Sequence, residues 1–321
     1  MEVSAIDVEN KTEKEVKKEK KITWKKIKKQ KFLIFMTLPF VIWVIIFKYL
    51  PLFGWLMAFQ DYKPGKFILN QKWVGLKHFK TLFQEPLFYQ SLKNTLAMSI
   101  LGLVFGTICS IGFALLLNEI RVKSFKKTVQ TVSYLPHFIS WVVAASIVTS
   151  MLAPSGVINE LLMNLHIIKA PIQFMSNPNY FWGIVTTSDI WKEMGWNAII
   201  YLAAITSIDQ EMYEAAKVDG AGRIRQIFSI TLPAIKPTIM VLLIMSIGNL
   251  INIGFEKQML LGNPIVYDKS LVIDKYALDY GIGMFRYSFG TAIGMFKSVV
   301  GIILVFGANK FAKKMGEGSL I

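Results

Sequence analysis

The chain alternates between long apolar runs and shorter polar, charged segments. A helix needs about twenty residues to cross the roughly 30 Å hydrocarbon layer of a membrane. We expect membrane-spanning helices at residues 32–50, 94–118, 128–152, 181–208, 238–255 and 288–309, the third kinked or started late by Pro136. The pattern predicts an all-α fold, a polytopic membrane bundle of six transmembrane helices.

The lysine-rich segments outside these runs predict the orientation of the chain. The tail 1–31 holds eleven lysines and six acidic residues, residues 119–127 form a basic turn, and three lysines follow the last run. The positive-inside rule places all three segments in the cytoplasm, and six spans then put both termini there. Segment 51–93 is an exception, since it falls outside yet carries six lysines against two acids. Either it is partly embedded or it is long enough to escape the rule.

Composition narrows the class of protein. The 321 residues are 53% hydrophobic with a mean hydropathy of +0.45, which is too apolar for a soluble domain. A net charge of +15 in such a chain serves topology and anionic lipid, and no nucleic-acid-binding signature accompanies it. The single cysteine, Cys109, excludes an internal disulfide, and no Cys/His cluster indicates a metal site.

One polar segment, residues 209–237, interrupts the apolar second half of the chain. It predicts two short helices joined at glycine. Ser207 or Asp209 is expected to cap the first helix, because their side-chain oxygens accept free amide protons of a first turn. Gly220 and Gly222 are expected to end it, since glycine tolerates the left-handed conformation common at helix ends. A second amphipathic piece follows and is expected to stop near Pro233.

The same segment carries a recognisable motif. It reads Glu214-Ala215-Ala216-x-x-Asp219-Gly220-Ala221, then eight residues, then Ile230-x-Leu232-Pro233. This pattern resembles the E-A-A loop of ABC-importer permeases. The resemblance implies a cytoplasmic loop that docks into a cleft on an ATP-hydrolysing subunit. It assigns the contact to Glu214 and the Ala215-Ala216 surface, the turn to Gly220, and pairing with acids of the partner to Arg223 or Arg225. The alternative is an ordinary interfacial helix pair without a partner.

The resemblance extends over roughly residues 32–315, between a basic tail (1–31) and a short C-terminal tail (316–321). Four further blocks, residues 94–96, 134–141, 263–268 and 296–301, look like maltose-type, binding-protein-dependent sugar permeases of the complex-polysaccharide branch. The family implies a heterodimer with a second permease, two cytoplasmic ABC ATPases, an extracytoplasmic solute-binding protein and an oligosaccharide substrate. It also implies alternating access in the bacterial cytoplasmic membrane.

No catalytic machinery of its own is expected in this chain. A phosphate-binding loop needs the pattern G-x-x-x-x-G-K-[ST], and the nearest fragment, residues 294–298, lacks that spacing. No hydrolase triad or pair of catalytic carboxylates stands out, and no bound cofactor is expected. ATP and Mg²⁺ would therefore bind to the partner ATPases, which makes this chain a transport subunit.

A path for sugar needs hydrogen-bonding side chains and aromatic faces that stack on a pyranose ring. The candidates within the predicted spans are Trp191, Trp196, Asn197, Asn249 and Asn252. Tryptophan also belongs at membrane interfaces, and asparagine also bridges helices, so both readings stay open.

Charged residues inside predicted spans are costly and often functional. Lys297 either faces the path, where it would suit an acidic sugar, or pairs with Asp189 or Glu193 to fix helix packing. These three residues also support an alternative, an ion-coupled secondary transporter, although no internal repeat is visible. A membrane-embedded glycan enzyme is a third class, for which no catalytic motif is recognisable.

Overall fold

The structure is a computed structural model that describes residue 28 and residues 30–314. The predicted tails, 1–31 and 316–321, therefore fall almost wholly outside the described residues. The chain divides into two compact units, Met1–Trp55 and Leu56–Ile321, which are considered separately.

The described residues are mostly helical, as the predicted all-α class requires, with a single two-stranded antiparallel ribbon. In chain order the elements are α3 (Lys31–Val44), η1 (Ile45–Tyr49), η2 (Leu50–Phe59), β1 (Gln60–Asp61), η3 (Ile68–Asn70), β2 (Lys72–Trp73), α4 (Lys77–Gln84), α5 (Pro86–Glu119), α6 (Lys123–Phe138), α7 (Trp141–Met151), α8 (Val157–Asn164), η4 (Phe174–Ser176), α9 (Pro178–Thr206), α10 (Gln210–Val218), α11 (Arg223–Gln226), η5 (Ile227–Thr231), α12 (Leu232–Gly248), α13 (Glu256–Leu261), η6 (Pro264–Val266), α14 (Tyr267–Ser270), α15 (Ile273–Tyr276), η7 (Ala277–Gly283) and α16 (Tyr287–Lys314).

The described part of the first unit contains the start of one long apolar helical run. The run covers Lys31–Phe59, 29 residues, and none of the residues of α3 or η1 is buried. An apolar helix that is exposed on all sides suits a hydrocarbon solvent, because its backbone groups are satisfied internally. The predicted first span is present and continues beyond its expected end at residue 50.

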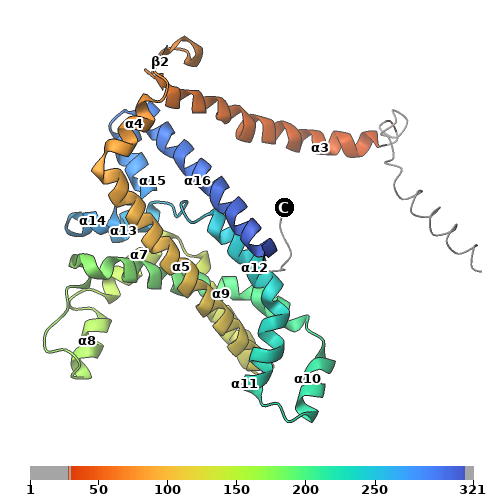
Figure 1. Cartoon of the computed structure of the whole chain (residues 1–321). Coiled ribbons are helices and arrows are strands. Elements are labelled where there is room, and N and C mark those ends of the chain that lie inside the picture. The colour runs from red at the N-terminus through yellow and green to blue at the C-terminus, as the bar shows by residue number, and fades with distance from the viewer. Residues whose placement is uncertain (1–27, 29, 315–321) are drawn as a thin grey trace, which may run out of the picture. The chain divides into compact units, whose positions relative to one another are not determined.

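In the second unit, α5 packs along α9 (Figure 1). The N-terminal half of α5 contacts the N-terminal half of α9, and the C-terminal ends of the two helices also meet. The two helices therefore run in the same direction, as a second and a fourth span should.

Three clusters of buried apolar residues hold the helices of this unit together. The first lies where α4, α5, α15 and α16 meet, the second where α5, α7 and α9 meet, and the third where α5, α9 and α12 meet. In lipid such packing is favoured by van der Waals contact, since the surrounding hydrocarbon is as apolar as the core.

Among the described residues, four helical runs are long and apolar enough to span a membrane, or five if the bent pair α6 and α7 counts as one span. The remaining predicted span, the fourth, corresponds to α9, whose 29 residues are long enough but include Asp189, Lys192 and Glu193. The bundle of membrane helices is confirmed, while the count of six stays a prediction.

The third and fifth spans differ from their predictions. The third bends by 106° between α6 and α7. Its break lies at Ile139 and Ser140, after Pro136, and the Ser140 hydroxyl caps α7 by accepting the amide proton of Val143. The fifth begins at Arg223 and ends at Gly248, so residues 249–255 form a turn beyond it. These shifts arise because caps and close tertiary contacts, which hydropathy does not report, set the helix ends.

The segment between the fifth and sixth spans, expected as an outer loop, is part of the core. Leu271, Val272 and Ile273 are fully buried. The Asn94 amide donates to the carbonyl oxygens of Asp268 and Leu271, both at 2.8 Å. Two of the blocks that carry the family resemblance, residues 94–96 and 263–268, are therefore joined directly.

The N-terminal end of α5 is tied to the same segment. The Tyr276 hydroxyl donates to a Glu85 carboxylate oxygen at 2.7 Å, and burial, followed by this partner, raises the pKa of the Tyr276 phenol. A second carboxylate oxygen of Glu85 accepts from Arg286 at 3.3 Å. These contacts fix the 267–283 segment over the helix ends.

Candidate functional site: a coupling loop and a cavity

The motif loop begins with a short capped helix, α10. Its N-cap is Asp209, whose carboxylate accepts the amide proton of Glu211 at 3.0 Å, while Ser207 ends α9 instead. Of the two predicted caps, Asp209 is correct and Ser207 is wrong.

The spacing of the motif matches the way α10 ends. Gly220 has φ +74°, and its amide donates to the carbonyl oxygen of Lys217. The Ala221 amide donates to the carbonyl oxygen of Ala216 at 2.8 Å. These two bonds form a Schellman motif, which satisfies the last free carbonyls of a helix and needs a left-handed residue at its centre. Gly220 alone fills that position, because Gly222 is the N-cap of α11 and has φ −66°.

The second half of the loop is continuous with the fifth span. α11, the π-helical turn η5 and α12 form one helical run, Arg223–Gly248, of 26 residues. The predicted stop near Pro233 is wrong. Pro233 follows the wider π turn of Ile227–Thr231, which accommodates a residue that lacks an amide donor.

Specific contacts hold α10 against this helix. The hydroxyl groups of Tyr213 and Thr231 are hydrogen-bonded at 2.9 Å, and Thr231 is buried. The Gln226 amide donates to the carbonyl oxygen of Ala221 at 2.8 Å. The loop is therefore a compact helix pair, not a flexible linker.

Arg223 has an ion-pair partner within its own chain, while pairing of Arg223 or Arg225 with acids of an ATPase stays a prediction. Its guanidinium lies 3.4 Å from a carboxylate oxygen of Glu119 at the end of α5, within the same chain. Both side chains are largely exposed, so the pair contributes little to stability. Arg225 and Glu214 are exposed.

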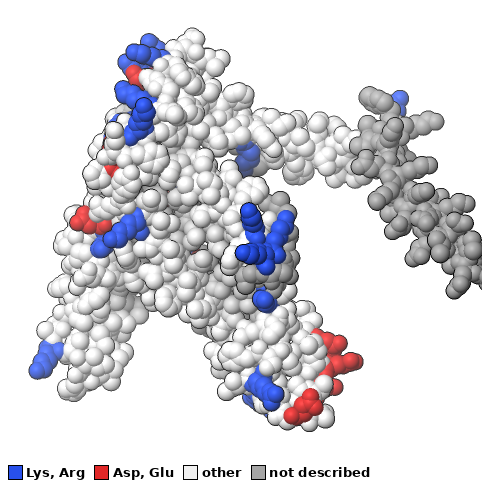
Figure 2. Space-filling view, viewed as in Figure 1, with Lys and Arg blue, Asp and Glu red and all other residues white. Residues whose placement is uncertain are grey.

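The exposed side chains of the loop are both apolar and charged. Val218, Ile224 and Phe228 are 88%, 73% and 66% exposed. Acidic side chains gather over α10 at the lower right of Figure 2. A small, rigid apolar surface with charged neighbours is typical of a protein-docking site. The structure brings together on this loop all the predicted coupling residues, Glu214, Ala215, Ala216, Asp219, Gly220, Ala221, Arg223 and Arg225.

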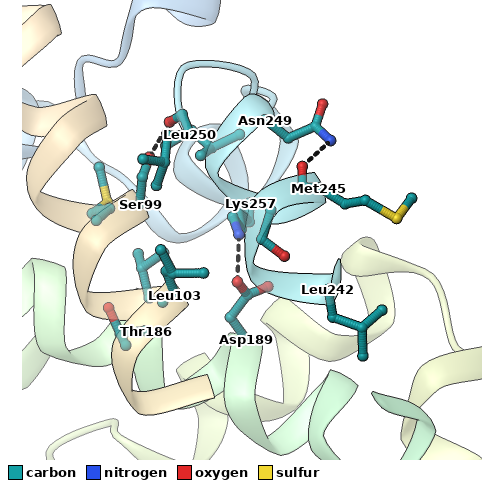
Figure 3. Close-up of a pocket in the computed structure, with 14 residues that line it drawn as sticks. Ser99, Leu103, Thr186, Asp189, Leu242, Met245, Asn249, Leu250 and Lys257 are labelled. Carbon is teal, nitrogen blue, oxygen red and sulfur yellow. Dashed lines mark hydrogen bonds and ion pairs between the residues drawn. The ribbon is translucent and has the colours of Figure 1, made fainter. Parts of the chain in front are cut away.

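A cavity of about 410 Å³ lies between the helices (Figure 3). It is enclosed by α5, α9, α12 and the start of α13. Its polar side chains are Ser99, Thr186, Asp189, Ser246, Asn249 and Lys257. A second cavity of about 170 Å³ shares Gly102, Leu103, Leu242 and Ser246 with the first and contains Asn197. Together they form a hollow along α5, α9 and α12.

Two of the predicted path residues lie on this hollow. Asn249 lines the larger cavity and Asn197 the smaller one. Asn249 and Asn252 lie in the turn after α12 and not inside a span, which corrects their expected position. Neither Asn252 nor Lys297 lines these two cavities.

The two tryptophans point elsewhere. Trp191 lines a separate, mostly apolar cavity of about 560 Å³ between α7 and α9. The Trp196 ring stacks on the His137 ring, with centroids 4.4 Å apart and planes within 2°. The structure thus places only Asn197 and Asn249 on the hollow and separates the other predicted path residues from it.

Each of the intramembrane charges has its own partner. Lys297 forms an ion pair with Asp274, not with Asp189 or Glu193 as expected. Asp189 pairs with Lys257 at 2.7 Å, and Glu193 pairs with His137 Nδ1 at 2.7 Å. Asp189, Glu193 and Lys297 therefore form no common cluster that would carry a coupling ion.

Sequence reasoning missed Lys257 and Thr186. Lys257 follows the predicted fifth span and looked like part of an outer loop, and Thr186 is one of several hydroxyl residues in an apolar run. Only the fold brings α13 back against α9, so no local signal marked either residue.

Comparison with protein families gives one match over most of the chain. The family model described as "Binding-protein-dependent transport system inner membrane component" matches residues 99–316. The matched region contains the motif loop and every residue that lines the two connected cavities except Met98.

Similar proteins agree with this match. The polygalacturonan/rhamnogalacturonan transport system permease protein YteP of Bacillus subtilis (strain 168) is 48% identical over 293 residues, 91% of each chain. A chain in the crystal structure of a bacterial ABC transporter involved in the import of the acidic polysaccharide alginate has a TM-score of 0.84 and 42% identity. The match covers 92% of this chain and 99% of that one. The same values describe a chain of the bacterial alginate transporter in complex with a periplasmic protein that carries an alginate pentasaccharide.

Proposed function

Because the chain belongs to the family of binding-protein-dependent transport system inner membrane components, we propose that it is a permease subunit of an ATP-driven importer for acidic oligosaccharides. The importer would move pieces of a complex polysaccharide across the bacterial cytoplasmic membrane by alternating access. Its relatives support the sugar class, since one is named for polygalacturonan and rhamnogalacturonan and another transports the acidic polysaccharide alginate.

The observation that carries this proposal is the continuity between the motif loop and the cavity. The helical run that starts at Arg223, in the loop, ends at Gly248, directly before Asn249 on the cavity wall. At 1.5 Å per residue, its 26 residues span about 39 Å. A helix of this kind transmits a displacement of the loop to the cavity with little loss, which is what alternating access requires.

The proposed mechanism assigns a task to each part of the loop. Val218, Ile224 and Phe228, with Glu214 beside them, dock into a cleft on the ATPase. The Schellman turn at Gly220 keeps the two helices in fixed geometry, so the loop moves as one body. When the two ATPases close on ATP, the docked loops approach one another and the attached spans tilt from an inward-facing to an outward-facing arrangement.

The proposed assembly contains further partners. A second permease completes the translocation path as a heterodimer, two cytoplasmic ATPases bind ATP and Mg²⁺, and an extracytoplasmic solute-binding protein delivers the sugar. The complex of the similar alginate transporter with its periplasmic protein supports the last of these. With the loop on the ATPase side, both termini lie in the cytoplasm.

Co-purification of the assembled complex tests the proposal. Gly220→Pro removes the amide donor and the positive φ on which the turn depends, and Glu214→Arg reverses a charge on the docking face. We expect both variants to retain the second permease and to lose the ATPases. Glu160→Arg, an exposed charge reversal on α8, is the matched control and keeps all subunits. ATPase binding by Gly220→Pro at the wild-type level would contradict a docking role for the loop.

A further inference from the structure

We propose that Lys257, with Asp189 and Thr186, forms a subsite in the larger cavity that selects for the carboxylate of an acidic sugar. This inference rests on the proposed importer function. It adds the residues that distinguish a charged substrate from a neutral one. The sugar carboxylate would bind the Lys257 ammonium while Asp189 stays hydrogen-bonded to it.

The position of Lys257 suits this task. Its Nζ atom lies 2.7 Å from Asp189 Oδ2, and both residues line the cavity (Figure 3). The side chains are 15% and 30% exposed, so the pair is neither sealed in a core nor surrounded by bulk water. Nζ also lies 5.7 Å from the centroid of the Trp141 ring, whose face favours a cation there.

The hydrogen-bonding capacity of Lys257 leaves room for a ligand. An ammonium group has three N–H donors, and Asp189 accepts one of them. The others are available to a carboxylate in the cavity. Among the residues that the structure describes, Lys257 and Asp189 are the only charged ones on the cavity wall. An anion that enters the cavity would therefore contact a cation that is already partly desolvated.

Asp189 sets the strength of this interaction. A lone buried lysine would bind an anion tightly and retain it, whereas a transport path needs binding that is weak enough to release the substrate. The carboxylate of Asp189 repels a second anion and so weakens its hold. The charge pair therefore discriminates between acidic and neutral sugars without trapping the acidic one.

Thr186 provides an independent indication that the cavity holds a polar ligand. Its side chain lies on the cavity wall, three residues before Asp189 on the same face of α9. Thr186 is 7% exposed, and within the described part of the chain its hydroxyl has no hydrogen-bond partner. Buried hydroxyl groups without a partner are uncommon, so this one marks a place beside the cavity where a polar partner is missing.

The test compares two probes, digalacturonate and its dimethyl ester, which lacks both negative charges and carries two additional methyl groups. The complete importer is reconstituted in vesicles with ATP, and initial uptake of each probe is measured. We expect Lys257→Gln to lower the ratio of acid to ester uptake at least tenfold, and Lys257→Arg to keep a ratio near that of wild type. Asp189→Asn is expected to lower the KM for the acid and leave the KM for the ester within twofold.

Lys275→Gln is the matched control. Lys275 forms an ion pair with Asp279 at 2.6 Å with similar exposure, but it lies outside the two connected cavities. If Lys257→Gln lowers uptake of both probes by the same factor, Lys257 is a packing residue and the inference is wrong. A wild-type importer that takes up the ester as well as the acid also overturns it, while leaving the importer function intact. Failure to import either probe with ATP would instead count against the proposed function itself.

Discussion

At the scale of single residues, the charges within the membrane region are paired through contacts distant in sequence. For Lys297 the sequence left two interpretations open, a place on the sugar path or an ion pair within the bundle, because an unpaired ammonium in a span is costly. Its partner, Asp274, lies on α15 in a segment that hydropathy assigns to an outer loop. Sequence reasoning could therefore predict the need for a partner but not its identity, since the pairing depends on how that loop folds back.

Replacement of Lys297 alone should lower the free energy of unfolding more than replacement of both Lys297 and Asp274. Asp274 also accepts the amide proton of Gly254 at 3.0 Å, so in Lys297→Met it stays largely buried with one neutral donor. We expect a loss of about 3 kcal/mol in the free energy of unfolding. In the double variant Lys297→Met/Asp274→Asn, most of this loss should be recovered. Thermal unfolding of the purified protein in detergent measures both, and a single variant as stable as wild type would contradict the buried ion pair.

At the scale of elements, the sequence predicted the features that depend on local patterns, but it did not predict those that depend on long-range packing. Gly220 and Gly222 predicted a helix end at glycine. The Schellman bonds at Gly220 show the physical basis of that end, whereas Gly222 begins the next helix. The continuation of the helix through Pro233 was missed, because a π turn ahead of a proline has no simple sequence signature. The bend between α6 and α7 was expected as a kink at Pro136, yet it occurs beyond that residue.

The contact between α6 and α9 yields a prediction at this scale. A Cβ atom at Gly195 would lie 2.1 Å from the carbonyl oxygen of Ser133, so the backbones touch there. Gly195→Ala should force the helices apart and lower the free energy of unfolding by about 2 kcal/mol. Gly183→Ala, on the same helix, meets nothing within 4 Å and should be neutral or stabilising by up to about 1 kcal/mol.

Thermal midpoints of the two glycine variants, recorded side by side, separate helix propensity from packing. Both substitutions improve helix propensity equally, so only the contact differs. Equal midpoints for Gly195→Ala and Gly183→Ala would mean that α6 and α9 do not pack as closely as described.

At the scale of the whole molecule, one helical run links the motif loop to a polar cavity. The sequence was sufficient to recognise a membrane bundle and its motif loop, since both depend on local composition and spacing. The cavity was only partly foreseen. The sequence identified Asn197 and Asn249 as candidates for the path. Lys257 and Thr186 could be assigned to the cavity only from the structure, in which α13 packs against α9. Polar residues that line a path share no spacing that a single chain reveals.

The most direct test of this account is the energy source for uptake. The complete complex in sealed vesicles should take up digalacturonate only when ATP is present on the side of the motif loop, and Glu214→Arg should abolish that uptake. Uptake that continues without ATP and follows a proton or sodium gradient would contradict the account, because transport would then not depend on an ATPase bound to the motif loop.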